Sequence, residues 1–214
     1  MKNFLGFFLA LSLLLTGAVL KVEAQSVDVA RVAFESGNYE EASAILRDVL
    51  SNGKKNTDAH YLLGVILKRQ GHTDEALSEF LIAVKQQKKN HDARFELSLL
   101  QIEKGLFKDA EKSMKEGLKR TKEKDARFFY AQGQLAIAQD DLQGAMVLFT
   151  RARGVDPTNP LYVRGLGDVY EAQNVWGMAI TNYRQALAMQ PNSPDAAATY
   201  YRIGQLHFKA RQWN

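Results

Sequence analysis

The chain has 214 residues, and its 28 lysines and arginines exceed its 24 acidic residues, which gives a formal net charge of +4. It contains no cysteine, which excludes disulfides, thiolate metal sites and a lipid anchor on an N-terminal cysteine. With only four prolines and no low-complexity linker, one elongated domain over residues 25–214 is the simplest interpretation.

The N-terminal segment differs in character from the rest of the chain. Lys2 precedes an apolar run over residues 4–20, which Val22-Glu23-Ala24 follows. A basic start, an apolar stretch and a small residue at the cleavage site are typical of a secretory signal peptide. We therefore expect residues 1–24 to be removed and the protein to be exported, to the periplasm or the secreted space. The run is close to the shortest length that spans a bilayer, so an inner-membrane anchor through residues 4–20 is the alternative.

The remaining sequence repeats with a period of about 34 residues. Five alanines mark the period: Ala42, Ala76, Ala110, Ala145 and Ala179. A small residue stands at a matching place earlier in each unit: Ala30, Gly64, Ser98, Gly133, Gly167 and finally Gly204. A large residue follows each alanine by four positions: Leu46, Phe80, Met114, Phe149 and Tyr183. Spacings of three and four place these residues on buried helix faces, and a small residue lets a second helix approach closely.

Each unit is predicted to be a pair of antiparallel helices joined by a tight turn. Residues that tolerate a left-handed backbone end the first helices: Gly37, Gly71, Gly105, Asp140 and Asn174. The second helices are expected to begin two residues later, at Tyr39, Thr73, Phe107, Leu142 and Trp176. Pro157 and Pro191 are stop signals after two of these second helices. Residues 196–211 are expected to form one more first helix.

This pattern of small, apolar, glycine, alanine and aromatic positions resembles the tetratricopeptide repeat family. Residues 57–90 and 160–193 match best, and units are expected over about 22–56, 57–90, 91–124, 126–159 and 160–193, with a partial unit or cap over 196–214. Asp125 is an apparent insertion, and Gln101 and Gln132 occupy usually apolar positions. The resemblance implies an all-α fold, a right-handed α-α superhelix, or solenoid, of antiparallel helix pairs. A generic helix bundle would share the helical period but not the five alanines.

Catalytic or metal-binding chemistry is not expected. The four histidines, His60, His72, His91 and His207, include no pair at the helical spacing that a metal requires. No phosphate-binding glycine loop or nucleophile motif is present, so we expect neither an enzyme nor a cofactor. Lysines crowd residues 104–124, but carboxylates lie among them, which favours a solvated helix face over a nucleic-acid site.

Function is therefore expected in binding. In the family, first helices line a concave groove that holds a peptide or a helix, and the matching positions here are Tyr61, Val65, Lys68, Phe95, Leu99, Tyr130, Gln134, Arg164, Asp168 and Arg202. Three aromatic residues would be apolar anchors (Tyr61, Phe95 and Tyr130), unless they pack only between helices. Arg164 and Arg202 would pair with acidic residues of the ligand.

The resulting prediction is a non-enzymatic scaffold of the cell envelope or secreted space whose partner is a protein or peptide. No nucleic acid is expected, and membrane contact is expected only if the N-terminal segment stays uncleaved. The alternatives are a membrane-anchored assembly factor, or the recognition part of a longer enzyme or sensor. The oligomeric state and the identity of the ligand are not predicted.

Overall fold

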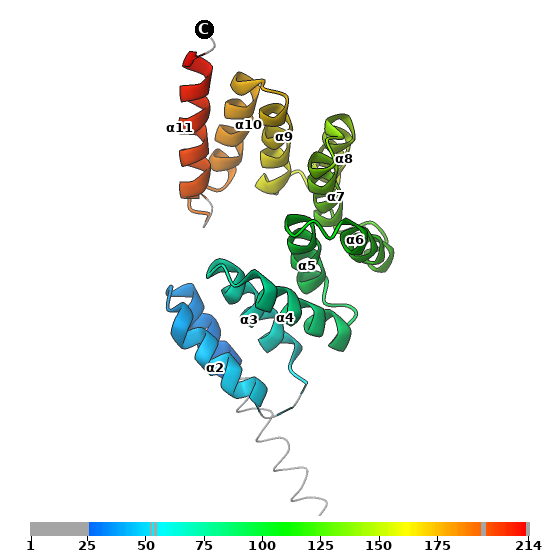
Figure 1. Cartoon of the computed structure of the whole chain (residues 1–214), viewed down its shortest axis with the longest axis vertical. Helices are drawn as coiled ribbons and strands as arrows, with labels where there is room; N and C mark the ends of the chain where they lie inside the picture. The colour runs from blue at the N-terminus through cyan, green and yellow to red at the C-terminus, as the bar shows by residue number, and fades with distance from the viewer. Residues whose placement is uncertain (1–25, 52, 54, 194–195, 213–214) are drawn as a thin grey trace, which may run out of the picture. The chain divides into compact units, whose positions relative to one another are not determined.

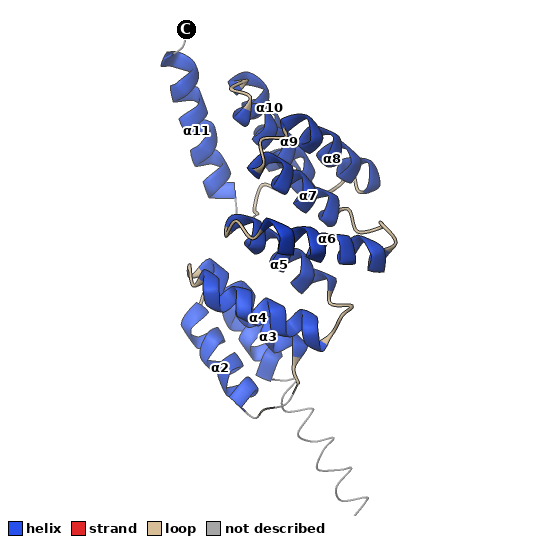
Figure 2. Cartoon of the chain, turned by 45° about the vertical axis from the view of Figure 1, so that its right-hand side comes forward, coloured by secondary structure: helices blue, strands red, loops and turns tan. Residues whose placement is uncertain are grey.

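The structure is a computed structural model that describes residues 26–51, 53, 55–193 and 196–212, and each regular element in these ranges is an α-helix (Figure 2). The all-α fold class expected from the repeat is thus confirmed. The predicted signal peptide over residues 1–24, with its alternative as an anchor, lies outside the described residues. Among the helices that are described, none is both long enough and apolar enough to cross a bilayer.

The chain divides into two compact units, and the division falls inside one helix. Unit 1 extends to Glu96 and unit 2 begins at Leu97. A helix over residues 26–35 comes first. The following helices of unit 1 are α2 (Tyr39–Ser51), α3 (Thr57–Arg69) and α4 (Thr73–Gln86), and α5 (His91–Glu103) crosses the boundary. Unit 2 continues with α6 (Phe107–Thr121), α7 (Arg127–Ala138), α8 (Leu142–Val155), α9 (Pro160–Ala172), α10 (Trp176–Met189) and α11 (Ala196–Gln212).

Helices pack on their neighbours in the chain. In unit 1, α3 contacts both α2 and α4. In unit 2, contacts run from α6 to α7 and so on to α11, and α7 also contacts α9, the first helix of the next repeat. Figure 1 shows α9, α10 and α11 side by side. Nearest-neighbour packing of this kind is what a stack of repeats produces.

The helix boundaries agree with the repeat. All five second helices begin at the residues that the pattern predicts, including Thr73, where the other four begin with an aromatic residue or leucine. The last described helix, α11, covers the predicted range 196–211. In each repeat, the turn between the two helices contains a residue in the left-handed region. The φ angle is 83° at Gly37 and Gly71, 71° at Gly105, 63° at Asp140 and 61° at Asn174.

One connection differs from the others. Lys122 and Glu123 also have positive φ, 52° and 59°, after α6, although neither is a glycine. The residue that the repeat marks as an insertion, Asp125, lies in this connection, and its carboxylate accepts hydrogen bonds from the backbone and guanidinium of Arg127. The extra residue is therefore accommodated in the loop, and the repeat resumes at α7.

The core follows the small and large positions of the repeat. The five alanines are fully buried, and so are the large residues that follow them by four positions. In three of the repeats the small residue is a glycine that faces an aromatic ring of the second helix. A Cβ added at Gly64 would lie 2.7 Å from the Phe80 ring, and one at Gly167 would lie 2.7 Å from the Tyr183 ring. Gly133 faces Phe149 in the same way. The absence of a side chain is what allows the rings to pack against the backbone.

Candidate functional site

A cleft in unit 2 brings together half of the predicted site residues. Its volume is about 310 Å³, and the three first helices α7, α9 and α11 line it together with α10. The lining residues are Tyr130 and Gln134 from α7, Arg164 and Asp168 from α9, Tyr183 from α10, and Ala198, Thr199 and Arg202 from α11. Residues one or two repeats apart in the sequence thus meet at one place.

Asp168 is the centre of the polar contacts in this cleft. Its carboxylate accepts hydrogen bonds from Gln134 Nε2 at 3.0 Å and from the Tyr183 hydroxyl at 2.8 Å. The guanidinium of Arg202 lies 3.0 Å from the same carboxylate. Donors from three other helices therefore converge on one acidic side chain of α9. Because these bonds involve an ionised group, they are stronger and more directional than bonds between neutral groups.

The cleft continues past Asp168 along α9. This part has a volume of about 410 Å³, and its lining includes Glu171, Trp176 and Lys209. Arg202 Nε donates to Glu171 at 2.6 Å, and its guanidinium lies 5.2 Å from the centre of the Tyr183 ring. Lys209 Nζ is 4.0 Å from the other Glu171 oxygen and 5.4 Å from the Trp176 ring. Two carboxylates and two cations thus balance each other along this wall.

The Tyr183 hydroxyl lies between the two carboxylates. It is 2.8 Å from Asp168 and 2.9 Å from Glu171. Burial, reinforced by the negative charge of Asp168, raises the pKa of Tyr183 far above its usual range. The hydroxyl therefore keeps its single proton at neutral pH and can donate it to either carboxylate. Burial lowers the pKa of Arg202, but the negative charges of Asp168 and Glu171 and the hydrogen bond to Glu171 outweigh it, so this pKa is raised.

Tyr130 connects the cleft to the core beneath it. Its ring is 4% exposed and packs 5.4 Å from the Phe149 ring and 6.2 Å from the Tyr162 ring. Its hydroxyl accepts a hydrogen bond of 3.4 Å from Arg164 Nη2, and burial raises its pKa. The Tyr130 hydroxyl is thus one of the groups that hold Arg164 at the edge of the cleft.

The other predicted site residues lie elsewhere. On α3, the Tyr61 ring is 6.2 Å from the Phe80 ring, and Lys68 Nζ forms an ion pair of 2.8 Å with Glu96. Val65 is half-buried on the same helix, and Leu99 is half-buried on α5. These positions are helix faces, as the repeat implies, but the four residues are not among those that line the cleft of unit 2.

Two expected roles need correction. Phe95 and Tyr130 are only 6% and 4% exposed, so their rings pack between helices and offer little surface as anchors for a ligand. Arg202, expected to meet an acidic ligand, already pairs with Asp168 and Glu171 of this chain. In both cases the neighbouring helix decided what the side chain contacts.

Sequence reasoning also missed Tyr183 as a cleft residue. The repeat pattern identifies it only as the large buried residue of its second helix. The sequence does contain a signal for this role. The other repeats have Leu46, Phe80, Met114 and Phe149 at this position, and none of these side chains carries a hydroxyl. A polar atom at an otherwise apolar position indicates a buried hydrogen-bond partner nearby.

Comparison with solved structures finds the same architecture in other repeat proteins. A thermophilic tetratricopeptide repeat protein of Thermus thermophilus is similar with a TM-score of 0.72 and 17% identity, over 87% of this chain and 99% of its own. MamA of Desulfovibrio magneticus is similar with a TM-score of 0.60 and 17% identity, over 80% and 97%. YrrB, a tetratricopeptide repeat protein with an unusual peptide-binding site, has a TM-score of 0.54 and 18% identity, over 82% and 90%. At these identities the likeness shows the fold alone.

Comparison with curated proteins finds no match. A family model of the tetratricopeptide repeat, however, matches residues 28–91, 66–125, 95–160 and 164–213, which together span most of the chain. The matched ranges contain all five of the buried alanines described above. On this evidence the chain belongs to the tetratricopeptide repeat family.

Proposed function

We propose that the chain is a non-enzymatic scaffold that binds a segment of another protein in the cleft of unit 2. Proteins with the tetratricopeptide fold are generally scaffolds for protein interactions. The observation that carries the proposal is that α7, α9 and α11 all line one cleft. YrrB, which shares the fold, has a peptide-binding site. In this chain the corresponding ligand would be an extended peptide or a helix that lies across the three first helices.

Arg164 is the side chain best suited to meet the ligand. It lines the cleft from α9, and its Nη2 donates a long hydrogen bond of 3.4 Å to the Tyr130 hydroxyl. A carboxylate of the ligand would offer a shorter, charge-assisted and bidentate contact. Asp168 and Glu171 both form ion pairs with Arg202 of α11. The proposed ligand therefore carries an acidic group toward Arg164, while the Asp168 network keeps the wall of the cleft in place.

Replacing Arg164 by alanine is expected to weaken capture of the partner about tenfold, because it removes the charged contact at the cleft. Arg153→Ala on α8 is the matched control, since Arg153 is exposed and does not line the cleft. The measurement is affinity capture from envelope extract at several bait concentrations, with partners identified and quantified by mass spectrometry. Equal capture by both variants, with unchanged circular dichroism, would reject the cleft as the binding site.

We further propose that the protein is exported and acts in the periplasm or the secreted space. The support is the basic start and the apolar run over residues 4–20. N-terminal sequencing of the protein recovered from the native cell is expected to begin at Gln25. A start at Met1 in a membrane fraction would contradict cleavage and favour the alternative, an assembly factor anchored through residues 4–20.

A further inference from the structure

Three repeats of this protein share one packing device. A glycine of the first helix receives an aromatic ring from the second helix, as Gly64 receives Phe80 and Gly167 receives Tyr183. The same device joins Gly133 to Phe149. The three glycines are buried, and the rings that cover them are fully buried as well. A glycine at this position is thus a notch that fits one large side chain of a packed helix.

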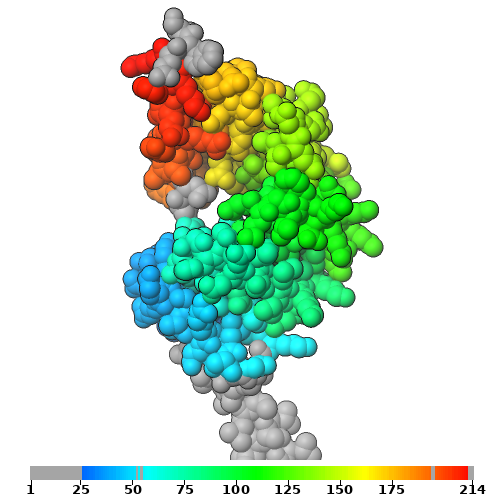
Figure 3. All heavy atoms as spheres, in the orientation of Figure 1, coloured from blue at the N-terminus to red at the C-terminus, as the bar shows by residue number. Residues whose placement is uncertain are grey.

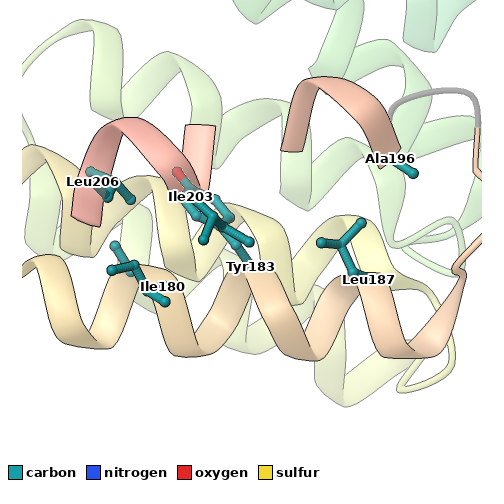
Figure 4. Packing of buried hydrophobic residues seen from close by; sticks show 7 residues of the cluster. Ile180, Tyr183, Leu187, Ala196, Ile203 and Leu206 are labelled. Carbon is teal, nitrogen blue, oxygen red and sulfur yellow. The ribbon is translucent and has the colours of Figure 1, made fainter. Parts of the chain in front are cut away.

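The last described helix, α11, has the same notch without a ring in it. Gly204 stands at the repeat position of Gly167, but no other described atom lies within 4 Å of where its Cβ would be, apart from its chain neighbours and its own helix backbone. Tyr200 is 60% exposed, whereas Val163, its counterpart on α9, is 1% exposed. The stripe that packs on α10 is buried, with Ile203 and Leu206 in contact with the α10 core (Figure 4). The open notch therefore lies on a different side of α11.

Aromatic side chains flank this notch. Tyr201 is 70% exposed and Phe208 is 65% exposed, and both line a surface hollow with Gly204. With Ala197 and Arg211, these residues recur at spacings of three and four and so share one helix face. We call this set, Ala197, Tyr201, Gly204, Phe208 and Arg211, the outer face of α11. Figure 3 shows the atoms of α11 in orange-red to red at the surface of unit 2. Large exposed aromatic residues that gather on one face are typical of a binding surface.

The charge of α11 indicates which partner fits. The helix contains no aspartate or glutamate, and its last turn carries Lys209 and Arg211. A second copy of α11 on this face would bring like charges together, which disfavours a symmetric contact between two copies. An acidic helix would meet the opposite charge.

We propose that the outer face of α11 binds an acidic amphipathic helix of another protein, whose aromatic side chain fills the Gly204 notch. This surface is separate from the proposed ligand contact at Arg164. The chain itself contains a helix of the required kind, because α4 carries the notch-filling Phe80 and three carboxylates, Asp74, Glu75 and Glu79, against the single Lys85. A peptide with the α4 sequence is therefore a rational probe of the α11 face.

The test measures binding of a fluorescent peptide, Thr73–Gln86, to the full chain by anisotropy. Gly204→Leu fills the notch and is expected to weaken binding about tenfold or more. Gly177→Leu is the matched control, because Gly177 is an exposed helical glycine of α10 with nothing within 4 Å of its added Cβ, and binding should be unchanged. A peptide with Phe80→Ala should also bind about tenfold more weakly. Arg164→Ala should leave this binding unchanged, which separates it from the cleft.

Several results would overturn the proposal. Equal affinity of the peptide for the parent chain and for Gly204→Leu would show that the notch is not the site. Equal binding of a peptide whose three carboxylates are replaced by lysine would reject the acidic partner. A dimer in analytical ultracentrifugation that Gly204→Leu converts to monomer would identify a second copy as the occupant. Binding to phosphatidylserine vesicles that is lost in Gly204→Leu would identify a lipid surface instead.

Discussion

Replacing Phe149 by alanine is expected to lower the free energy of unfolding by about 3–5 kcal/mol. The Phe149 ring is fully buried and lies against two glycines, Gly133 on α7 and Gly165 on α9. It also packs 5.4 Å from the Tyr130 ring. One side chain of α8 therefore joins the first helices of two successive repeats. Since both notches would be emptied at once, the cavity could not close without moving backbone.

Urea unfolding followed by circular dichroism measures this loss. Val147→Ala is the control, because Val147 lies on the same helix and is exposed, so its truncation should change stability by less than about 0.5 kcal/mol. A loss below about 1 kcal/mol for Phe149→Ala would contradict the packing described here. The affinity of the proposed ligand for the cleft should also fall in this variant, because the Tyr130 ring loses its contact with the Phe149 ring.

Replacing Gly167 by leucine is expected to lower the free energy of unfolding by about 3 kcal/mol, at the upper end of the usual cost of overpacking. Even a Cβ at this position would lie 2.7 Å from the Tyr183 ring. The Tyr183 side chain cannot move away easily, because its hydroxyl lies within hydrogen-bond distance of both Asp168 and Glu171. The added side chain would therefore displace α10 from α9, or break the polar contacts of the cleft.

The same substitution at Gly204 is expected to have the opposite sign. Apart from its own helix backbone and its chain neighbours, nothing described lies within 4 Å of a Cβ at Gly204, so the first carbon of a leucine side chain meets no obstacle there. Leucine also favours the helix over glycine by roughly 0.5–1 kcal/mol. Thermal and urea unfolding of both variants would compare the two positions directly. If Gly204→Leu destabilised the chain as much as Gly167→Leu does, the notch on α11 would not be open.

Helix pairs, turns and the buried alanines could all be predicted from the sequence. Tyr39, Thr73, Phe107, Leu142 and Trp176 were correctly placed as the starts of second helices. Asp140 and Asn174 were correctly expected to replace glycine in the left-handed turn position. These features depend on side chains within one repeat. They can therefore be predicted from local backbone preferences and from the helical period of the sequence. The repetition of the pattern through the chain then strengthened each individual assignment.

The contacts of the cleft could not be predicted in this way. Asp168 was expected to face a ligand, yet it accepts from Gln134 one repeat earlier and from Arg202 one repeat later. Lys68 was assigned to the groove, yet it pairs with Glu96. A hydrogen bond requires its donor and acceptor to lie within a few tenths of an ångström of the ideal distance. The placement of whole helices decides which side chains meet this requirement. The periodic sequence alone therefore determined the repeat, the helix faces and the buried positions. Only the tertiary structure decided which polar side chains meet in the cleft, and that the notch on α11 is left open.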